Sequence, residues 1–134
     1  MPHFTHDDLY DLALDGIKQD CDKMVLCDGE PTTFANANTD NGTGSGQKIA
    51  ESAMASGDFT IADGDTSGRK VTSGAKSSIA VGAAGDGEYV AYLDTVSSKI
   101  LHYYQIATAR NGLITSDTVN FPAHDLEIRD TVAE

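Results

Sequence analysis

Hydrophobic residues recur at helical spacing near the start of the chain. The apolar side of the predicted helix holds Leu9, Leu12, Ala13, Leu14 and Ile17. Acidic and polar residues occupy the intervening positions, which is typical of a helix that packs on a protein body. We therefore predict one N-terminal helix that ends between residues 19 and 22 and rests on the protein's own sheet.

The first residues of this helix are of types that stabilise a helix N-terminus. Thr5 is a suitable capping residue, because its hydroxyl can accept a hydrogen bond from a free backbone N–H. Asp7 and Asp8 follow in the first turn, where the helix dipole favours negative charge.

Beyond residue 22 the hydrophobic period changes to that of strands. Short apolar or alternating runs are separated by turn signals that contain Gly, Asn and Asp. The predicted strands are residues 24–27, 47–53, 59–62, 69–73, 77–81, 88–93, 99–107, 113–115, 118–121 and 125–129. Asn111 and Gly112 predict a two-residue turn, because both residues tolerate positive φ. The tyrosine-rich runs 88–93 and 99–107 predict paired central strands.

This order of elements predicts an α+β fold that is mainly β: an N-terminal helix followed by an antiparallel β-sandwich or small barrel. We expect a single domain, residues 1–134, with an arm and helix over 1–22 and a β-body over 23–134. Residues 32–37 are predicted to be a polar connector. Residues 36–46 are predicted to be a flexible loop, either a disordered tip or a docking loop.

Charge narrows the classes of partner. The 134 residues include 21 acidic and 9 basic ones, a net charge of −12. Such a field disfavours nucleic acid and anionic membranes, so neither is an expected partner. The acidity indicates either a non-sticky surface suited to a salty medium or ordinary solubility. No secretory signal and no apolar run near the roughly 20 residues of a membrane span is visible, so we expect use without export.

Candidate metal and redox chemistry is weak. Cys21 and Cys27 could pair, but two cysteines make no disulfide framework, and we expect two reduced, partly buried thiols. Residues 63–68 match the first half of a calcium-binding loop. Such a loop needs a bidentate Glu at its twelfth position, and that position is Gly74, so a tight turn is the better interpretation. His3 and His6, at i and i+3, form at best a weak metal site. We predict no metal and no cofactor.

The same holds for catalysis. His102 lies beside Tyr103 in a predicted strand, where a base could lie, but no nucleophile occupies a G-x-S-x-G elbow. The glycines over 42–46 are not followed by Gly-Lys-Ser/Thr, so a phosphate loop is unsupported. We predict no catalytic residues and no enzyme.

Three strings in order carry a resemblance to a known family. They are VLCDGEPTTF at residues 25–34, GRKVT at 68–72 and VNFPAHDLEIRD at 119–130. They are similar to strings in a family of small virion structural proteins of tailed bacteriophages, over about residues 5–130. The loop at 36–46 differs freely from that family. Tyrosine-rich strands replace a Trp-bearing strand over 88–107.

The resemblance implies a capsid decoration (cement) protein on the capsid exterior of the virion, assembled in the host cytoplasm. The implied partners are the major capsid protein and the chain itself, as a homotrimer at threefold positions. Two alternatives stay open. One is a tail, fibre or head–tail connector component, and the other is a free β-sandwich binding module, for example for carbohydrate.

Two segments are the predicted partner contacts. The first is the N-terminal arm, Pro2, His3 and Phe4, where an apolar ring stands in a polar terminus. Aromatic side chains of this kind dominate interface energetics. The second is the loop over 38–46, and its predicted contact residues are Asn38, Thr39, Asp40 and Asn41.

Overall fold

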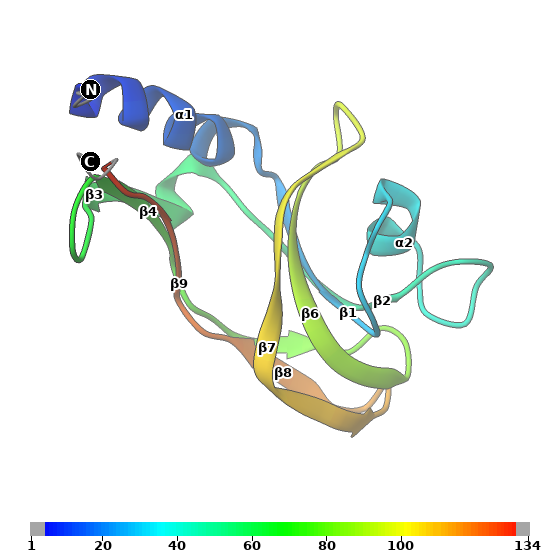
Figure 1. Cartoon of the computed structure of the whole chain (residues 1–134). Helices are drawn as coiled ribbons and strands as arrows, with labels where there is room; N and C mark the ends of the chain where they lie inside the picture. The colour runs from blue at the N-terminus through cyan, green and yellow to red at the C-terminus, as the bar shows by residue number, and fades with distance from the viewer. Residues whose placement is uncertain (1–4, 131–134) are drawn as a thin grey trace.

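The computed structural model describes residues 5–130 and is mainly β, with antiparallel sheets and one main helix (Figure 1). The predicted arm residues Pro2, His3 and Phe4 lie outside the described residues. The elements are α1 (Asp7–Asp20), β1 (Lys23–Cys27), α2 (Phe34–Asn38), β2 (Lys48–Ala53), the 3-10 helix η1 (Ser56–Asp58), β3 (Phe59–Asp63), β4 (Arg69–Ser73), β5 (Lys76–Ala80), β6 (Gly85–Asp94), β7 (Lys99–Leu113), β8 (Thr118–Phe121) and β9 (His124–Ile128).

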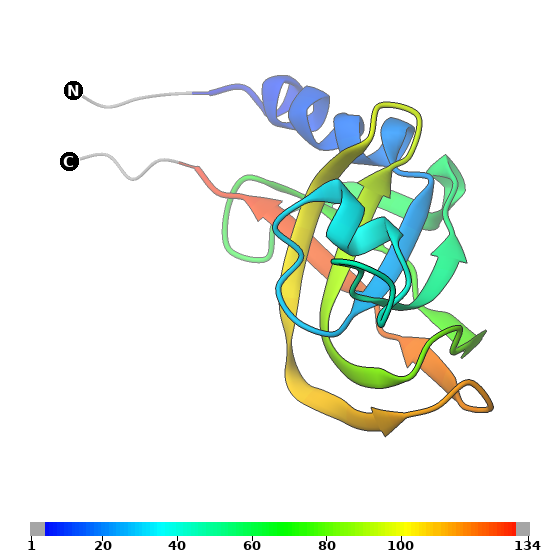
Figure 2. The same cartoon turned by 90° about the vertical axis from the view of Figure 1, so that its right-hand side faces the viewer.

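The strands form three sheets. The largest has the order β2-β1-β6-β7, a second has the order β3-β4-β9, and β5 pairs with β8 (Figures 1 and 2). A single bridge between Ala50 and Val81 connects β2 to the β5–β8 pair. The predicted pairing of the two tyrosine-rich strands is confirmed, since Val90 of β6 lies opposite Tyr104 of β7. The expectation that both are central is wrong, because β7 is the last strand of its sheet.

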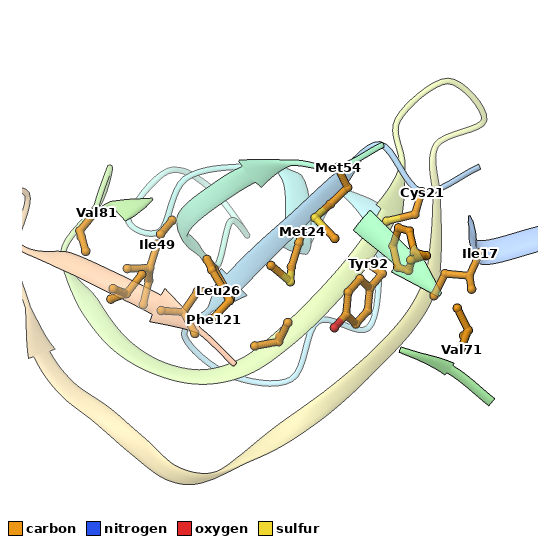
Figure 3. Packing of buried hydrophobic residues seen from close by; sticks show 14 of the residues in the cluster. Ile17, Cys21, Met24, Leu26, Ile49, Met54, Val71, Val81, Tyr92 and Phe121 are labelled. Atoms are coloured by element: carbon orange, nitrogen blue, oxygen red, sulfur yellow. The ribbon is translucent and has the colours of Figure 1, made fainter. Parts of the chain in front are cut away.

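The main core lies between the large sheet and the other elements (Figure 3). Met24 of β1 and Tyr92 of β6 point toward Val71 of β4 and Phe121 of β8, and all four are buried. Burial of side chains of this size contributes roughly 1.5–3 kcal/mol each. The three sheets therefore share one core.

The outer face of the large sheet is also covered. Val25, Cys27 and Ala91 are buried there together with Ala37 of α2. The strand β1 is consequently buried on both faces, which explains why its sequence is a continuous apolar run and does not alternate. The polar connector predicted at this point is wrong in part, because residues 34–38 are helical.

The helix α1 is confirmed, but its cap and its buried side differ from the prediction. His6 is the N-cap: its Nδ1 accepts a hydrogen bond from the backbone N–H of Asp8 at 3.2 Å, and Thr5 precedes it. Leu14 and Ile17 are buried, whereas Leu9 and Leu12 are 60% and 71% exposed.

An ion pair accounts for the rotation of this helix. Asp11 binds Arg69 of β4 with an Nε–Oδ1 distance of 2.7 Å. Asp11, Leu14 and Lys18 follow one another at helical spacing, so this pair turns the Leu14 side toward the sheet. The other leucines are left facing away.

The turn predicted at Asn111–Gly112 is wrong. Both residues lie inside β7, which continues to Leu113, and the strand predicted over 113–115 does not exist as a separate element. Gly112 has a φ of +67°, as a turn glycine would, but its N–H donates to Oδ1 of Asp86 at 2.8 Å. Pairing with β6 therefore overrides the local turn propensity.

Among the helices within residues 5–130, none has the length and apolar character that crossing a bilayer requires.

Candidate functional site

The predicted loop contacts lie in a segment that is fastened to the body. Asn38 accepts a hydrogen bond from Nζ of Lys23 at 3.1 Å, and Asp40 pairs with Lys48 at 3.3 Å. The amide of Asn41 donates to Ala84 O at 2.8 Å and to Asp28 Oδ2 at 3.1 Å. Three of the four side chains, those of Asn38, Asp40 and Asn41, thus make internal contacts, and Asp40 is the only one of the four that is exposed.

Hydrogen bonds also fix the turn at the start of the loop. Thr33 caps α2 by accepting from Asn36 N at 3.1 Å, and the Asn36 side chain accepts from Thr33 N. The same Asn36 amide donates to Ser45 O at 2.8 Å, which ties the far end of the loop to the helix. This capping-box pattern explains why a short helix forms in a polar stretch.

The calcium-like string forms ion pairs with the chain's own cations. Asp63 pairs with Arg69, and Asp65 pairs with Lys70 at 2.6 Å. Within residues 5–130 no group of three or more His, Cys, Asp or Glu side chains is placed to hold a metal ion.

The structure brings together two histidines that the sequence keeps apart. His102 of β7 and His124 of β9 have their Nε2 atoms 3.2 Å apart, and the Tyr104 ring stacks on His124 with centroids 3.7 Å apart. Burial lowers the pKa of both imidazoles, and for His124 the neighbouring His102 lowers it further. Beside them Tyr92 and Ser73 share a buried hydrogen bond of 2.7 Å.

This cluster is a contact between two sheets. The cavity beside it, which Phe59, Tyr92 and His124 line, has a volume of about 10 Å³. A space of that size holds about one water molecule and admits no substrate.

A large groove lies between β7 and β8, with a volume of about 730 Å³. We call it the β7–β8 groove: residues 104, 106–111 and 113 of β7 line one side, and residues 119–122 line the other. Buried side chains lie at its base, among them Leu26, Val90 and Phe121. The volume falls in the roughly 300–1,000 Å³ range of ligand-binding pockets.

Both sides of the groove are sheet edges. In the described part of the chain β7 pairs only with β6, and β8 pairs only with β5. The large sheet runs β7-β6-β1-β2 and is bridged to the β5–β8 pair, so β7 and β8 are the two ends of this series of strands. Figure 1 shows β7 bending round toward β8 at this place.

The register between β6 and β7 is irregular along the groove. Tyr89 pairs with Gln105, and Gly87 pairs with Arg110, so one residue of β6, Glu88, faces four of β7, residues 106–109. These four residues line the groove. Bulges of this kind bend a strand and leave backbone groups outside the ladder, and they are over-represented next to functional sites.

The chemistry of the groove is that of binding. No carboxylate, histidine or cysteine is among the described residues that line it. Its charged group is Arg110, which is exposed and forms no ion pair within residues 5–130. An apolar base with one guanidinium at the rim is chemically complementary to an apolar group that carries a negative charge.

The tyrosines do not form an exposed aromatic platform. Tyr92 is 1% exposed and Tyr103 is 36% exposed, while Tyr89 and Tyr104 are half-buried. The sequence did not reveal the groove, because it depends on which strands end as edges. The sequence feature that corresponds to the groove is the uncharged stretch at residues 105–109, which lies in the edge strand β7.

The chain matches no protein-family model, no curated protein and no solved structure.

Proposed function

We propose that this protein is a non-enzymatic structural protein of a phage virion that decorates the outside of the capsid shell by binding the major capsid protein. The observation that carries the proposal is the open β7–β8 groove, an apolar hollow flanked by two strand edges and by Arg110, all three without a partner in residues 5–130. Exposed strand edges are ready templates for pairing with another chain. A groove of this form is suited to hold a segment of another protein.

The three strings that resemble the phage family also support the proposal by their positions. Residues 69–72 lie in β4 and residues 124–128 in β9, and the two strands pair, with Val71 opposite Leu126. Strings that are far apart in sequence thus share one sheet. This is expected where a common fold, rather than chance, maintains both of them.

Self-association as a homotrimer is part of the proposal. Leu9 and Leu12 present an apolar strip on α1, 60% and 71% exposed, which the body leaves uncovered. A closed symmetric oligomer buries the same patch on each copy. A trimer would match threefold positions on a shell and would bury both leucines. We further propose that the β-body is a small barrel that is open between β7 and β8.

The test is the copy number of this protein in purified particles, by quantitative mass spectrometry against the major shell protein. A ratio near one-to-one supports decoration. A handful of copies per particle supports the tail, fibre or connector role, and absence from particles overturns a virion function.

A further inference from the structure

The β7–β8 groove has the form of a barrel from which one strand is missing. Its two sides are the free edges of β7 and β8, and its base consists of core side chains, among them Val119 and Phe121. An extended segment laid between the edges would meet main-chain donors and acceptors along its length and would place alternate side chains on the apolar base. A compact small molecule would use the base and leave the edges unpaired.

The backbone of β7 supports this occupant. Residues 106–109 face the single residue Glu88 in β6, so their peptide groups exceed what the neighbouring strand can pair. Backbone N–H and C=O groups need partners. A segment lying along the groove would supply them.

The edge also lacks the usual protection against pairing. Natural edge strands are often blunted by lysines, inward-pointing charges or proline. Residues 105–109 of β7 carry no charge and no proline, whereas β8 is followed by Pro122, which limits pairing at that end. Of the two edges that line the groove, that of β7 is thus the unprotected one.

Charge indicates the side chain that the segment brings. Arg110 stands at the rim without an ion pair in the described part of the chain, in a protein with a net charge of −12. A guanidinium binds a carboxylate with two parallel hydrogen bonds. The complementary segment therefore alternates apolar residues and carries an Asp or Glu that reaches Arg110.

We propose that the β7–β8 groove receives an extended segment of the shell protein, which pairs with β7 by main-chain hydrogen bonds and places a carboxylate on Arg110. This inference deepens the proposed function and rests on it for the source of the segment. The pairing itself is a property of this chain and can be tested without the shell.

The experiment selects from a library of random dodecapeptides on the full chain. We expect the selected peptides to alternate apolar and polar residues and to contain an acidic one. They should protect the amides of residues 106–109 and 118–121 from hydrogen exchange. N-methylation at alternate peptide residues should weaken binding at least about tenfold, because it removes main-chain donors.

Two matched charge reversals on the same strand test the role of Arg110. Arg110→Glu should weaken peptide binding at least about tenfold. Lys99→Glu makes the same change of charge on β7 outside the groove and should alter binding by no more than about twofold. Hydrogen exchange of the β1 and β6 amides verifies that both variants fold.

The inference is overturned if no peptide is enriched, if protection maps elsewhere, or if N-methylation and Arg110→Glu leave affinity unchanged. It is also overturned if the groove is filled by a second copy, seen as self-association that Arg110→Glu abolishes. Particle counts separate the two proposals. If wild type and Arg110→Glu are both present one-to-one with the shell protein in particles, the decoration role stands but the groove is not what binds the shell. Peptide binding with no copies on particles retains the groove and removes decoration.

Discussion

His102 and His124 meet across two sheets with their Nε2 atoms 3.2 Å apart. One nitrogen donates a proton to the other, so at least one ring must be neutral for the contact to exist. The Tyr104 ring stacks on His124, and Tyr92 lies against both imidazoles. This aromatic cluster joins β7 to β9, which belong to different sheets.

The pair predicts a loss of stability in mild acid. Burial lowers the pKa of both imidazoles in the folded state, so below the ordinary value of about 6.5 the unfolded chain binds more protons. The free energy of unfolding should be highest above that pH and should fall as pH decreases through it. The neighbouring Asp125 carboxylate raises the pKa of His124 and offsets part of the effect.

Urea unfolding at about pH 7.5 and about pH 5.5 measures this dependence, since histidine is the side chain that titrates in that window. His124→Phe should be less stable at neutral pH but should lose less between the two values. His6→Asn, which keeps a capping side chain on α1, should retain the full dependence. Equal pH dependence in wild type and His124→Phe would contradict the assignment.

The buried hydrogen bond between Ser73 Oγ and Tyr92 Oη, 2.7 Å long, should contribute measurably to stability. Ser73→Ala leaves a buried phenol without this partner and should lower the free energy of unfolding by about 1–3 kcal/mol. The double variant with Tyr92→Phe should cost less than the sum of the two single changes. Urea unfolding of the four proteins closes this cycle, and simple additivity would show that the two hydroxyls act independently.

Gly87 is expected to resist substitution. A Cβ at this position would lie 2.7 Å from Cδ2 of Leu26, a residue at the base of the groove. Gly87→Ala should therefore destabilise the protein by about 1–3 kcal/mol through overpacking. The matched control is Gly16→Ala in α1, where nothing lies within 4 Å and where we expect a gain of about 0.5–1 kcal/mol. Thermal unfolding of the two variants should shift in opposite directions.

Leu12 is expected to contribute to self-association rather than to folding. Leu12→Asp should reduce the mass in solution from trimer to monomer and change the free energy of unfolding of the monomer by less than about 0.5 kcal/mol. Val96, 90% exposed at the turn between β6 and β7, provides the control as Val96→Asp. Light scattering after size exclusion measures the mass. A trimer that survives Leu12→Asp places the contact elsewhere.

Both cysteines are expected to be unreactive in the folded protein. Burial raises the pKa of Cys21 to about 11 and that of Cys27 to about 12. Cys27 is the last residue of β1 and Cys21 lies before its first, and a strand of five residues spans about 13 Å, beyond the ~7 Å that a disulfide bridges. A thiol reagent at neutral pH should label neither residue without urea and both with it. Rapid labelling of the native chain would show that β1 opens.

Much of the fold could be predicted from local pattern. The strands β4 and β8 begin and end where the sequence predicts, because turn residues mark both ends of each. The buried side of α1 was wrong in part: Leu14 and Ile17 are buried as predicted, but Leu9 and Leu12 are exposed. The sequence does not reveal that Asp11 on this helix binds the distant Arg69 of β4. The Asn111–Gly112 turn was wrong because Asp86, on another strand, binds the backbone there.

The candidate site could not be predicted in the same way. Ile106 and Phe121 line one groove only because the large sheet ends at β7 and the small one at β8, which is a matter of strand order. The pairing of His102 with His124 likewise depends on two sheets facing each other. Local sequence carries information on turns and faces, and it carries little on which edges stay open.

The uncharged edge of β7 has a consequence for the purified protein. An exposed strand edge is a template for pairing with the same edge of another copy, and a net charge of −12 opposes that contact by repulsion between copies. Added salt shortens the range of this repulsion to about 10 Å at 0.1 M and about 3 Å at 1 M. We therefore expect concentrated solutions to aggregate faster at high ionic strength, and low-salt buffers at neutral pH should keep the chain dispersed longest.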